Sequence, residues 1–224
     1  MSIAEDIATA LKIRGLLLRG GFRASADDGL PEGAGTVLMV GNAGPDLWRV
    51  FPQAPEARDG QPNGLDRWTR RVMTEFAQAF GARAVLPFDG PPYAPFQRWA
   101  QRAEPVYPSP IGILIHPDYG LWHAYRGALV FEQALDLPPA DDRPRPCDSC
   151  PDQPCLTTCP VGAFTGAGYD VAACASHIAT TAGQDCVDGG CLARRACPVG
   201  TDYRYSADQA SWHMRAFLGA NASG

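Results

Sequence analysis

The residues of this chain best suited to chemistry are eight cysteines. All of them fall between positions 147 and 197 of the 224-residue chain. Their order is Cys147-x2-Cys150-x4-Cys155-x3-Cys159-Pro160, then Cys174, then Cys186-x4-Cys191-x5-Cys197-Pro198. Thiolates bind soft metals, and four of them hold one cubane of four irons and four sulfides. Eight cysteines therefore match two [4Fe–4S] clusters with none left over.

The spacing also indicates how the cysteines divide. It resembles that of two-cluster ferredoxins, in which the last cysteine of each run binds the other cluster. On this pattern set A is Cys147, Cys150, Cys155 and Cys197, and set B is Cys159, Cys174, Cys186 and Cys191. A proline follows each closing cysteine, where it removes a backbone donor and turns the chain away from the cluster.

Disulfides and zinc are the alternative uses of clustered cysteines. The first residues, Met1–Asp6, carry acids where a secretory signal needs positive charge, so reduced thiols are expected. Zinc ribbons favour two CxxC pairs far apart rather than a run that closes with Cys-Pro. The chain has no CxxCH for covalent haem. The cysteines therefore favour iron–sulfur clusters over both alternatives.

Composition limits the other classes of function. The chain is 46% hydrophobic and 19% charged with a net charge of −5, which is typical of a globular protein. No Lys or Arg run in it resembles a nucleic-acid footprint, which disfavours a nucleic-acid partner. Its longest apolar stretches, such as Ile111–Ile115 and Gly127–Phe131, are strand-sized and too short for a membrane span. We therefore expect a soluble, cytoplasmic protein.

Hydrophobic periodicity and turn residues predict an alternation of helices and strands. The expected elements are a helix from the Ser2–Glu5 capping box to Gly20-Gly21, a strand at Thr36–Val40, a helix at Leu65–Phe80, a strand at Ala84–Phe88, a short helix at Gln97–Arg102, a hairpin of Ile111–His116 and Leu121–Phe131, and a helix from Ser206 to Leu218. This order indicates an α+β protein with an α/β sheet domain in residues 1–140. A two-cluster, ferredoxin-like segment is expected at 141–205, and a C-terminal helix at 206–224 that packs back on the first domain.

The predicted hairpin carries a second signal, the run Ile111-Gly-Ile-Leu-Ile-His116-Pro-Asp-Tyr119-Gly-Leu-Trp122-His-Ala-Tyr-Arg-Gly127. It resembles the IHPxFGxWFAxRG stretch of CblC-type cobalamin-processing proteins and the LLIxPxYGxWxxLG stretch of epoxyqueuosine reductases. The reductases place this stretch before a two-cluster segment, as this chain does. The resemblance implies a nitroreductase-like sheet domain whose cavity holds cobalamin.

The same resemblance suggests which side chains contact a bound cofactor. It implies that His116, Tyr119 and Trp122 line the cavity, with His116 over the corrin face or on its cobalt. Read from the residues alone, His116 is better explained as a strand-end histidine bonded to the backbone of the Pro117–Gly120 turn. Trp122 is equally well explained as an ordinary core aromatic.

One catalytic residue follows from the reductase pattern. Phe88-Asp89-Gly-Pro-Pro92 lies where those enzymes have VDxxPxxER with a proton-donating Asp, so Asp89 matches it. In an apolar pocket such a carboxyl has a raised pKa and can donate a proton. The alternative is that Asp89 only bonds within a turn. The reductase GLGWxGKN segment is replaced here by residues 104–112, which disfavours a tRNA-bound substrate.

These observations predict an iron–sulfur oxidoreductase. Two [4Fe–4S] clusters would take electrons from a donor such as a flavodoxin or a reductase and pass them to a corrinoid or small molecule in the first domain. The first alternative is a plain electron-transfer protein with no second cofactor. The second, less favoured, is a flavin-dependent reductase with an attached ferredoxin.

Overall fold

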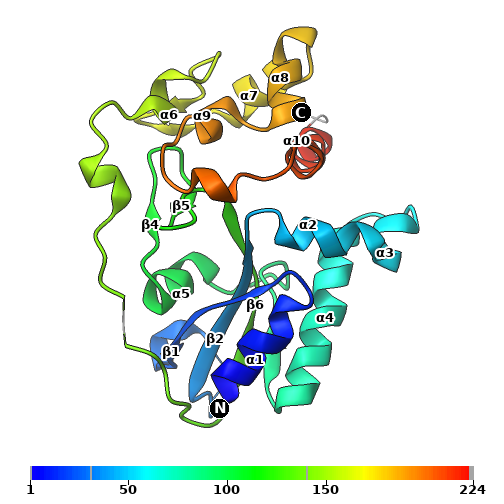
Figure 1. Ribbon diagram of the computed structural model, residues 1–224, viewed down its shortest axis with the longest axis vertical. Coiled ribbons are helices and arrows are strands. Elements are labelled where there is room, and N and C mark those ends of the chain that lie inside the picture. Colours follow the sequence, from blue (N-terminus) through cyan, green and yellow to red (C-terminus); the bar gives the residue numbers. More distant parts are fainter. Residues whose placement is uncertain (1, 31, 140, 222–224) are drawn as a thin grey trace. The chain divides into compact units, whose positions relative to one another are not determined.

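The computed structural model describes residues 2–30, 32–139 and 141–221 (Figure 1). The chain forms two compact units. Unit 1 consists of Met1–Pro105 and His123–Asp142, and unit 2 of Val106–Trp122 and Arg143–Gly224. None of the helices in the described ranges is both long and apolar enough to cross a membrane.

Unit 1 is built on a four-stranded antiparallel sheet. Its strands, in spatial order, are β1 (Leu17–Arg23), β2 (Thr36–Ala43), β6 (His123–Phe131) and β3 (Arg83–Val85). Every residue of β2 is buried, because the strand lies inside the sheet and is covered on both faces. In the β2–β6 register Val37 pairs with Val130 and Met39 with Ala128. The predicted mixed α/β sheet domain is therefore confirmed.

Alternate side chains of the sheet pack on different helices. On one face Val37 and Val130 contact Trp99 of α5 (Phe96–Ala103). On the other face Met73 of α4 (Gly64–Phe80) lies over the backbone of Gly127. The predicted helices at 65–80 and 97–102 are thus confirmed. The remaining helices of unit 1 are α1 (Ile3–Lys12), α2 (Asp46–Val50), α3 (Pro55–Arg58) and the 3-10 turns at Ala26–Asp28 and Phe51–Gln53.

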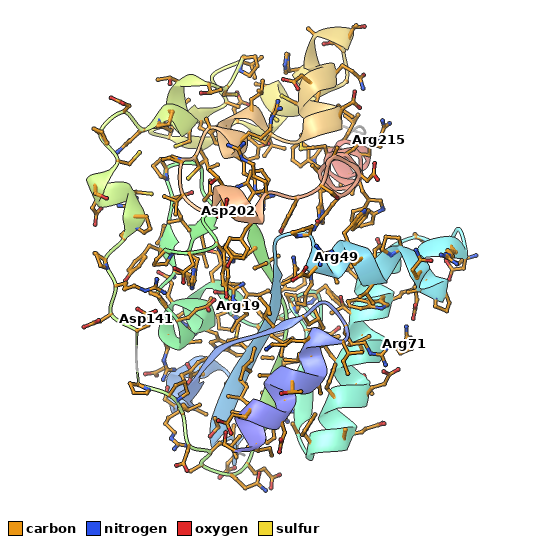
Figure 2. The ribbon with its side chains drawn as sticks, viewed as in Figure 1. Arg19, Arg49, Arg71, Asp141, Asp202 and Arg215 are labelled. Atoms are coloured by element: carbon orange, nitrogen blue, oxygen red, sulfur yellow. The ribbon has the colours of Figure 1, made fainter. Side chains whose placement is uncertain are left out.

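A buried ion pair joins β1 to the end of α5. Arg19, 1% exposed, donates from Nε to Glu104 Oε2 at 3.1 Å (Figure 2). Glu104 also accepts a hydrogen bond from the Tyr125 hydroxyl of β6. Arg19 Nη2 lies 3.3 Å from His123 Nδ1. A buried charge is tolerated when it is paired and hydrogen-bonded. This network ties β1, β6 and α5 together inside unit 1.

Unit 2 consists of short elements joined by turns. They are β4 (Tyr107–Pro108), β5 (Leu114–Ile115), β7 (Phe164–Thr165), β8 (Gly168–Tyr169), α6 (Pro154–Thr157), α7 (Val171–Ile178), α8 (Gln184–Gly189), α9 (Leu192–Arg195), α10 (Ala207–Asn221) and 3-10 turns at Pro146–Ser149, Thr181–Gly183 and Thr201–Tyr203. Two apolar clusters form its core. One contains Ile111, Ile115, Leu121, Cys155, Ala193 and Cys197, and the other Ile178, Cys186 and Val187.

The predicted hairpin of Ile111–His116 and Leu121–Phe131 is wrong. β5 pairs with β4, and β6 pairs with β2 and β3, so the two strands belong to different sheets. Only the bridge between His116 and Gly120 closes the intervening turn. The reason is packing: Ile111, Ile115 and Leu121 bury their side chains against the cysteine segment. The grouping of 106–122 with unit 2 also differs from the expected division near residue 140.

One further expectation, at the N-terminal end of the chain, differs from the structure. The first helix ends at Lys12 rather than at Gly20-Gly21, and the two glycines lie in β1 at a bulge between Leu18 and Gly21. Phe22 packs in the sheet core, which explains why a strand forms there. The predicted last helix is confirmed as α10 and packs on α7 and α8 of its own unit. Its packing on the first domain stays a prediction.

Candidate functional site

The four cysteines of set A line a single hollow in unit 2. Cys147 and Cys150 come from the 3-10 turn Pro146–Ser149 and the residue after it, Cys155 from α6, and Cys197 from the residues after α9. The other lining residues are Pro110, Ile115, Pro146, Gln153, Pro154, Pro198 and Val199. Among the described side chains, no three of His, Cys, Asp or Glu converge as they do around a single metal ion. The thiols of set A instead border one apolar space.

The four cysteines of set B are also brought together. Cys174 of α7 and Cys186 of α8 both pack on the Ile178–Val187 cluster. The pKa of Tyr169 is raised by burial, by a hydrogen bond with Cys174, and by nearby Cys191 and Cys159. Cys159 and Cys191 also contact the apolar cluster that holds Cys155 and Cys197, so the two sets adjoin.

The surroundings of the sulfurs fit metal-bound thiolates. Burial raises the pKa of the Cys155, Cys186, Cys191 and Cys197 thiols. Backbone N–H groups act in the opposite direction, because a hydrogen bond to a thiolate stabilises its charge. The pKa of the Cys191 thiol is lowered by hydrogen bonds from the backbone N–H groups of Ala193 and Arg194. The Leu192 N–H group acts in the same way on Cys186, and the Val199 N–H group on Cys197. Ala163 donates to Cys159 Sγ at 3.4 Å. Buried thiols with aimed donors are the environment in which a cluster sulfur is stabilised.

A backbone contact fixes the segment 106–122 against set A. Gly120 (φ 56°) and Gly200 (φ 70°) both have left-handed backbones. A Cβ added to Gly120 would lie 2.0 Å from the carbonyl oxygen of Val199, and one added to Gly200 would lie 2.4 Å from that of Tyr119. The His116–Gly120 turn therefore lies directly on the chain that follows Cys197.

His116 is held by this turn. Its ring is 4% exposed, and Nδ1 accepts from the N–H groups of Asp118 at 3.0 Å and Tyr119 at 3.3 Å. The ring stacks on that of Tyr119, with centroids 4.4 Å apart. Because Nδ1 is an acceptor, the neutral ring carries its proton on Nε2. Of the two interpretations, the backbone-bonded turn histidine describes this geometry, and such a ring cannot coordinate a metal through Nε2 while it keeps that proton.

Trp122 lies in an aromatic stack that the sequence did not predict. Its indole is 2% exposed, and the Arg194 guanidinium is 4.6 Å from the indole centroid and 4.5 Å from that of Tyr205. Arg194 Nε also donates to the carbonyl oxygen of Leu121 at 2.9 Å. Arg194 is three residues after Cys191, so this contact links Trp122 to set B. Trp122 Nε1 has no hydrogen-bond partner among the described residues.

Asp89 lies in unit 1 and is half-exposed. Arg70 of α4 binds it through both guanidinium nitrogens, with Nη1 3.3 Å from Oδ2. Its backbone N–H donates to the carbonyl oxygen of Leu86 at 3.2 Å, as in a turn. Within unit 1 the carboxylate therefore has an ion pair rather than the expected apolar surroundings. A role for Asp89 as a proton donor stays a prediction.

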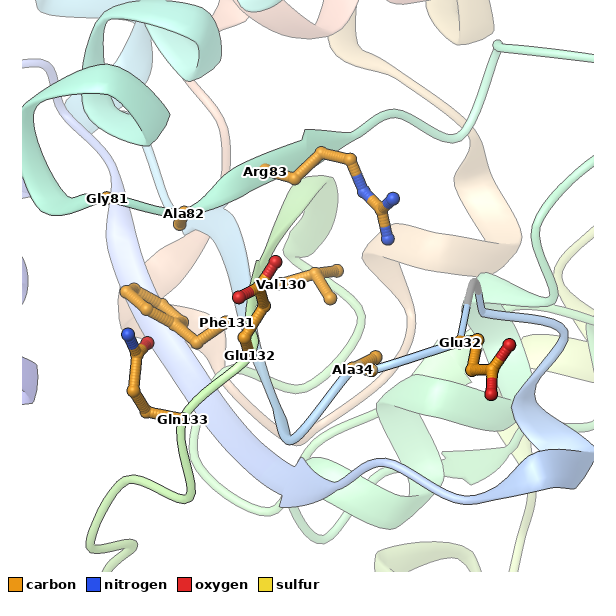
Figure 3. A pocket seen from close by; sticks show the side chains of 10 residues that line it. Glu32, Ala34, Gly81, Ala82, Arg83, Val130, Phe131, Glu132 and Gln133 are labelled. Carbon is orange, nitrogen blue, oxygen red and sulfur yellow. The ribbon is translucent and has the colours of Figure 1, made fainter.

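Unit 1 also has a pocket that the sequence did not predict. It measures about 290 Å³ and lies where β6 ends and β3 begins (Figure 3). Its lining residues are Glu32, Gly33, Ala34, Gly81, Ala82, Arg83, Val130, Phe131, Glu132 and Gln133. They include none of the predicted site residues.

Comparisons with known proteins place the fold. No protein-family model matches the chain, and no curated protein matches its sequence. Solved structures that are similar in fold include the following three. Epoxyqueuosine reductase with a tRNA-Tyr epoxyqueuosine-modified stem loop has a TM-score of 0.51 and 14% identity over 91% of this chain. Epoxyqueuosine reductase from Streptococcus thermophilus has a TM-score of 0.51 and 15% sequence identity over 94% of this chain. The B12-trafficking protein CblC of C. elegans, a homologue of human MMACHC, has a TM-score of 0.53 and 15% sequence identity over 94% of this chain.

The extent of the similarity differs between these structures. The chain covers 66% and 70% of the two reductases and 91% of CblC. At such low identity the comparison establishes the mixed α/β fold, as the sequence predicted, and not an activity.

The His116 geometry leads to a test of stability. Replacing His116 with Ala should leave the Asp118 and Tyr119 N–H groups without their ring acceptor. The free energy of unfolding should then fall by about 1–3 kcal/mol. Since 1 kcal/mol corresponds to roughly 2–4 °C in a chain of this size, the thermal midpoint should fall by several degrees. His116→Asn, whose side-chain oxygen can replace Nδ1, should recover much of the loss. Equal midpoints for the Ala variant and the unaltered protein would contradict the assignment.

Proposed function

We propose that this protein is an iron–sulfur redox protein whose two cysteine sets each hold a [4Fe–4S] cluster, and that it reduces a corrinoid or another small molecule. One observation carries the first half of the proposal: Cys197 lies beside Cys147, Cys150 and Cys155 around one apolar hollow. The spacing of the eight cysteines predicts the same partition. When bound, the clusters supply one-electron transfer.

The protein's own groups would serve that chemistry in three ways. Burial of the Cys155, Cys186 and Cys197 thiols keeps water from these three sulfurs, which lowers the local dielectric constant. Backbone N–H groups of Leu192, Ala193 and Val199 stabilise thiolate charge. Pro146, Pro154 and Pro198 border the hollow without offering an N–H group of their own. Reduced thiols of this kind suit a reducing compartment, so we place the protein in the cytoplasm.

The corrinoid part of the proposal is supported by fold and by position. The fold is similar to that of a B12-trafficking protein and of epoxyqueuosine reductases. The segment with His116, Tyr119 and Trp122 resembles the corresponding stretch of both families and is packed against set A through Ile115 and Leu121. We propose that these three side chains line the ligand site. The tautomer of His116 favours a hydrogen-bonding role over coordination of cobalt.

Two roles are less well supported. For Asp89 to donate a proton, its ion pair with Arg70 would have to open, so any such role depends on a change at Arg70. The tRNA stem loop in one similar structure belongs to that reductase. The net charge of −5 and the altered 104–112 segment favour a small-molecule substrate here.

The crossed assignment of Cys197 can be tested directly. Cys197→Ala and Cys147→Ala each remove one ligand of set A and should abolish the same cluster. Both variants should therefore leave the same electron paramagnetic resonance spectrum after reduction, that of set B. Cys191→Ala should leave the other spectrum, that of set A. If Cys197→Ala instead matches Cys191→Ala, the two closing cysteines do not cross.

The corrinoid proposal predicts binding that visible spectroscopy can follow. Aquocobalamin titrated with the protein should show a spectral change as its lower base is displaced. Tyr119→Ala should weaken binding roughly tenfold, because an aromatic contact is worth about 1 kcal/mol or more. Tyr93→Ala, at an exposed tyrosine of unit 1, is the matched control and should bind normally. No change at high protein concentration would leave a plain electron carrier as the better account.

A further inference from the structure

One stretch of unit 2 is almost free of charge although it is largely exposed. Residues 154–184 contain one Asp, Glu, Lys or Arg side chain, Asp170, whereas the chain's 19% charged composition would give about six. The stretch is not hidden in a core: residues 165–172 are all exposed. A solvent-facing surface normally carries charges of both signs. Their depletion is typical of the centre of a protein–protein contact.

The same stretch exposes large apolar side chains. Val161 is 40% exposed, Tyr169 40% and Val171 38%, which makes three of the seven large hydrophobic side chains exposed in the described parts of the chain. We call these three residues, with the β7–β8 turn between them, the hairpin face. Tyr169 stacks on Phe164 across the hairpin, with centroids 4.9 Å apart and planes at 15°. A second ring, Phe217 of α10, lies 6.2 Å from it, and Tyr169 still keeps 40% of its surface exposed.

The hairpin face covers set B. Val161 follows Cys159 by two residues, and Ala163 of the same turn donates to Cys159 Sγ. The Tyr169 hydroxyl hydrogen-bonds with Cys174. Asp170, the one charged residue, caps α7 by accepting a hydrogen bond from the Ala173 N–H group at 2.9 Å. The exposed apolar residues are therefore separated from the set B thiols by one layer of chain.

We propose that the hairpin face is the docking surface for a small one-electron donor protein, and that electrons enter through set B. This inference rests on the proposed function, since it requires a cluster at set B. In each transfer the donor loses one electron and the set B centre gains it, with no bond made or broken. The donor's contact face should itself be apolar and poor in charge, because Asp170 is the one charged side chain that this stretch offers. Such redox contacts are small and transient.

The test compares point variants in anaerobic stopped-flow reduction. The probes are a flavodoxin hydroquinone and a reduced two-cluster ferredoxin, each followed by bleaching of the cluster absorption. Val161→Asp and Val171→Asp should each lower the second-order rate constant about tenfold or more with whichever donor reduces the unaltered protein. Ile13→Asp places the same charge on a 78%-exposed apolar residue of unit 1 and should change nothing. Dithionite, which needs no docking surface, should reduce all four proteins alike.

The salt dependence gives a second readout. Because the face has almost no charge, the rate constant should change by less than about threefold between roughly 50 and 500 mM salt, whereas a charge-steered contact changes steeply. Unaltered rates in both Val variants, equal slowing by Ile13→Asp, or no reaction with either donor would overturn the docking surface. So would self-association of the unaltered chain that Val161→Asp abolishes, which would make the face a contact between copies. Failure of dithionite to reduce any of the proteins would instead reject the clusters themselves.

Discussion

The architecture of unit 2 depends on bringing Cys197 back to Cys147, Cys150 and Cys155, which precede it by many residues. The segment 143–200, which contains the four thiols that border this hollow, has no helix longer than α7. Short helices and turns place each sulfur instead. The return of the chain after Cys197 then fixes what lies next to it. Val199 and Gly200 pass so close to Tyr119 and Gly120 that only glycines fit at the two contact points.

This arrangement explains why residues 106–122 belong with the cysteines rather than with the sheet. Ile111, Ile115 and Leu121 bury their side chains in the same apolar cluster as Cys155, Ala193 and Cys197. The same segment carries the His116–Tyr119 stack and ends at Trp122. The segment that resembles cobalamin-handling proteins is therefore part of the cysteine unit. Electron transfer and ligand contact would then share one piece of structure, with Arg194 joining set B to Trp122.

Patterns that are local in the sequence were predicted best. The apolar residues of α4 recur at helical spacing, and β2 is a continuous apolar, partly β-branched run. Each pattern predicts a buried element, and the structure has both. The partition of the cysteines between two clusters also rests on spacing and stays a prediction. β1 was missed because Gly20-Gly21 is also a helix-ending signal, and only packing of Phe22 on Trp99 decides for a strand. The false hairpin has a similar cause: good turn residues between two apolar runs do not say which neighbour each run pairs with.

Side-chain environments were the least predictable. The pairing of Asp89 with Arg70 depends on how α4 lies beside a loop, which no local pattern encodes. Likewise, Cys191-Leu-Ala-Arg194 gives no sign that the guanidinium lies between two aromatic rings. For His116 both interpretations were available from the sequence, and the positions of two backbone N–H groups distinguish them. These side-chain contacts are set by tertiary packing rather than by composition or by the spacing of apolar residues.

The central claim is that eight thiols hold two [4Fe–4S] clusters. Its most direct test is the iron, sulfide and zinc content of protein purified without oxygen, together with the Mössbauer spectrum of the iron. Two cubanes require about eight irons and eight sulfides per chain, with the spectrum of [4Fe–4S] centres. About two zinc ions per chain with no iron or sulfide would contradict the account and make both cysteine sets structural zinc sites.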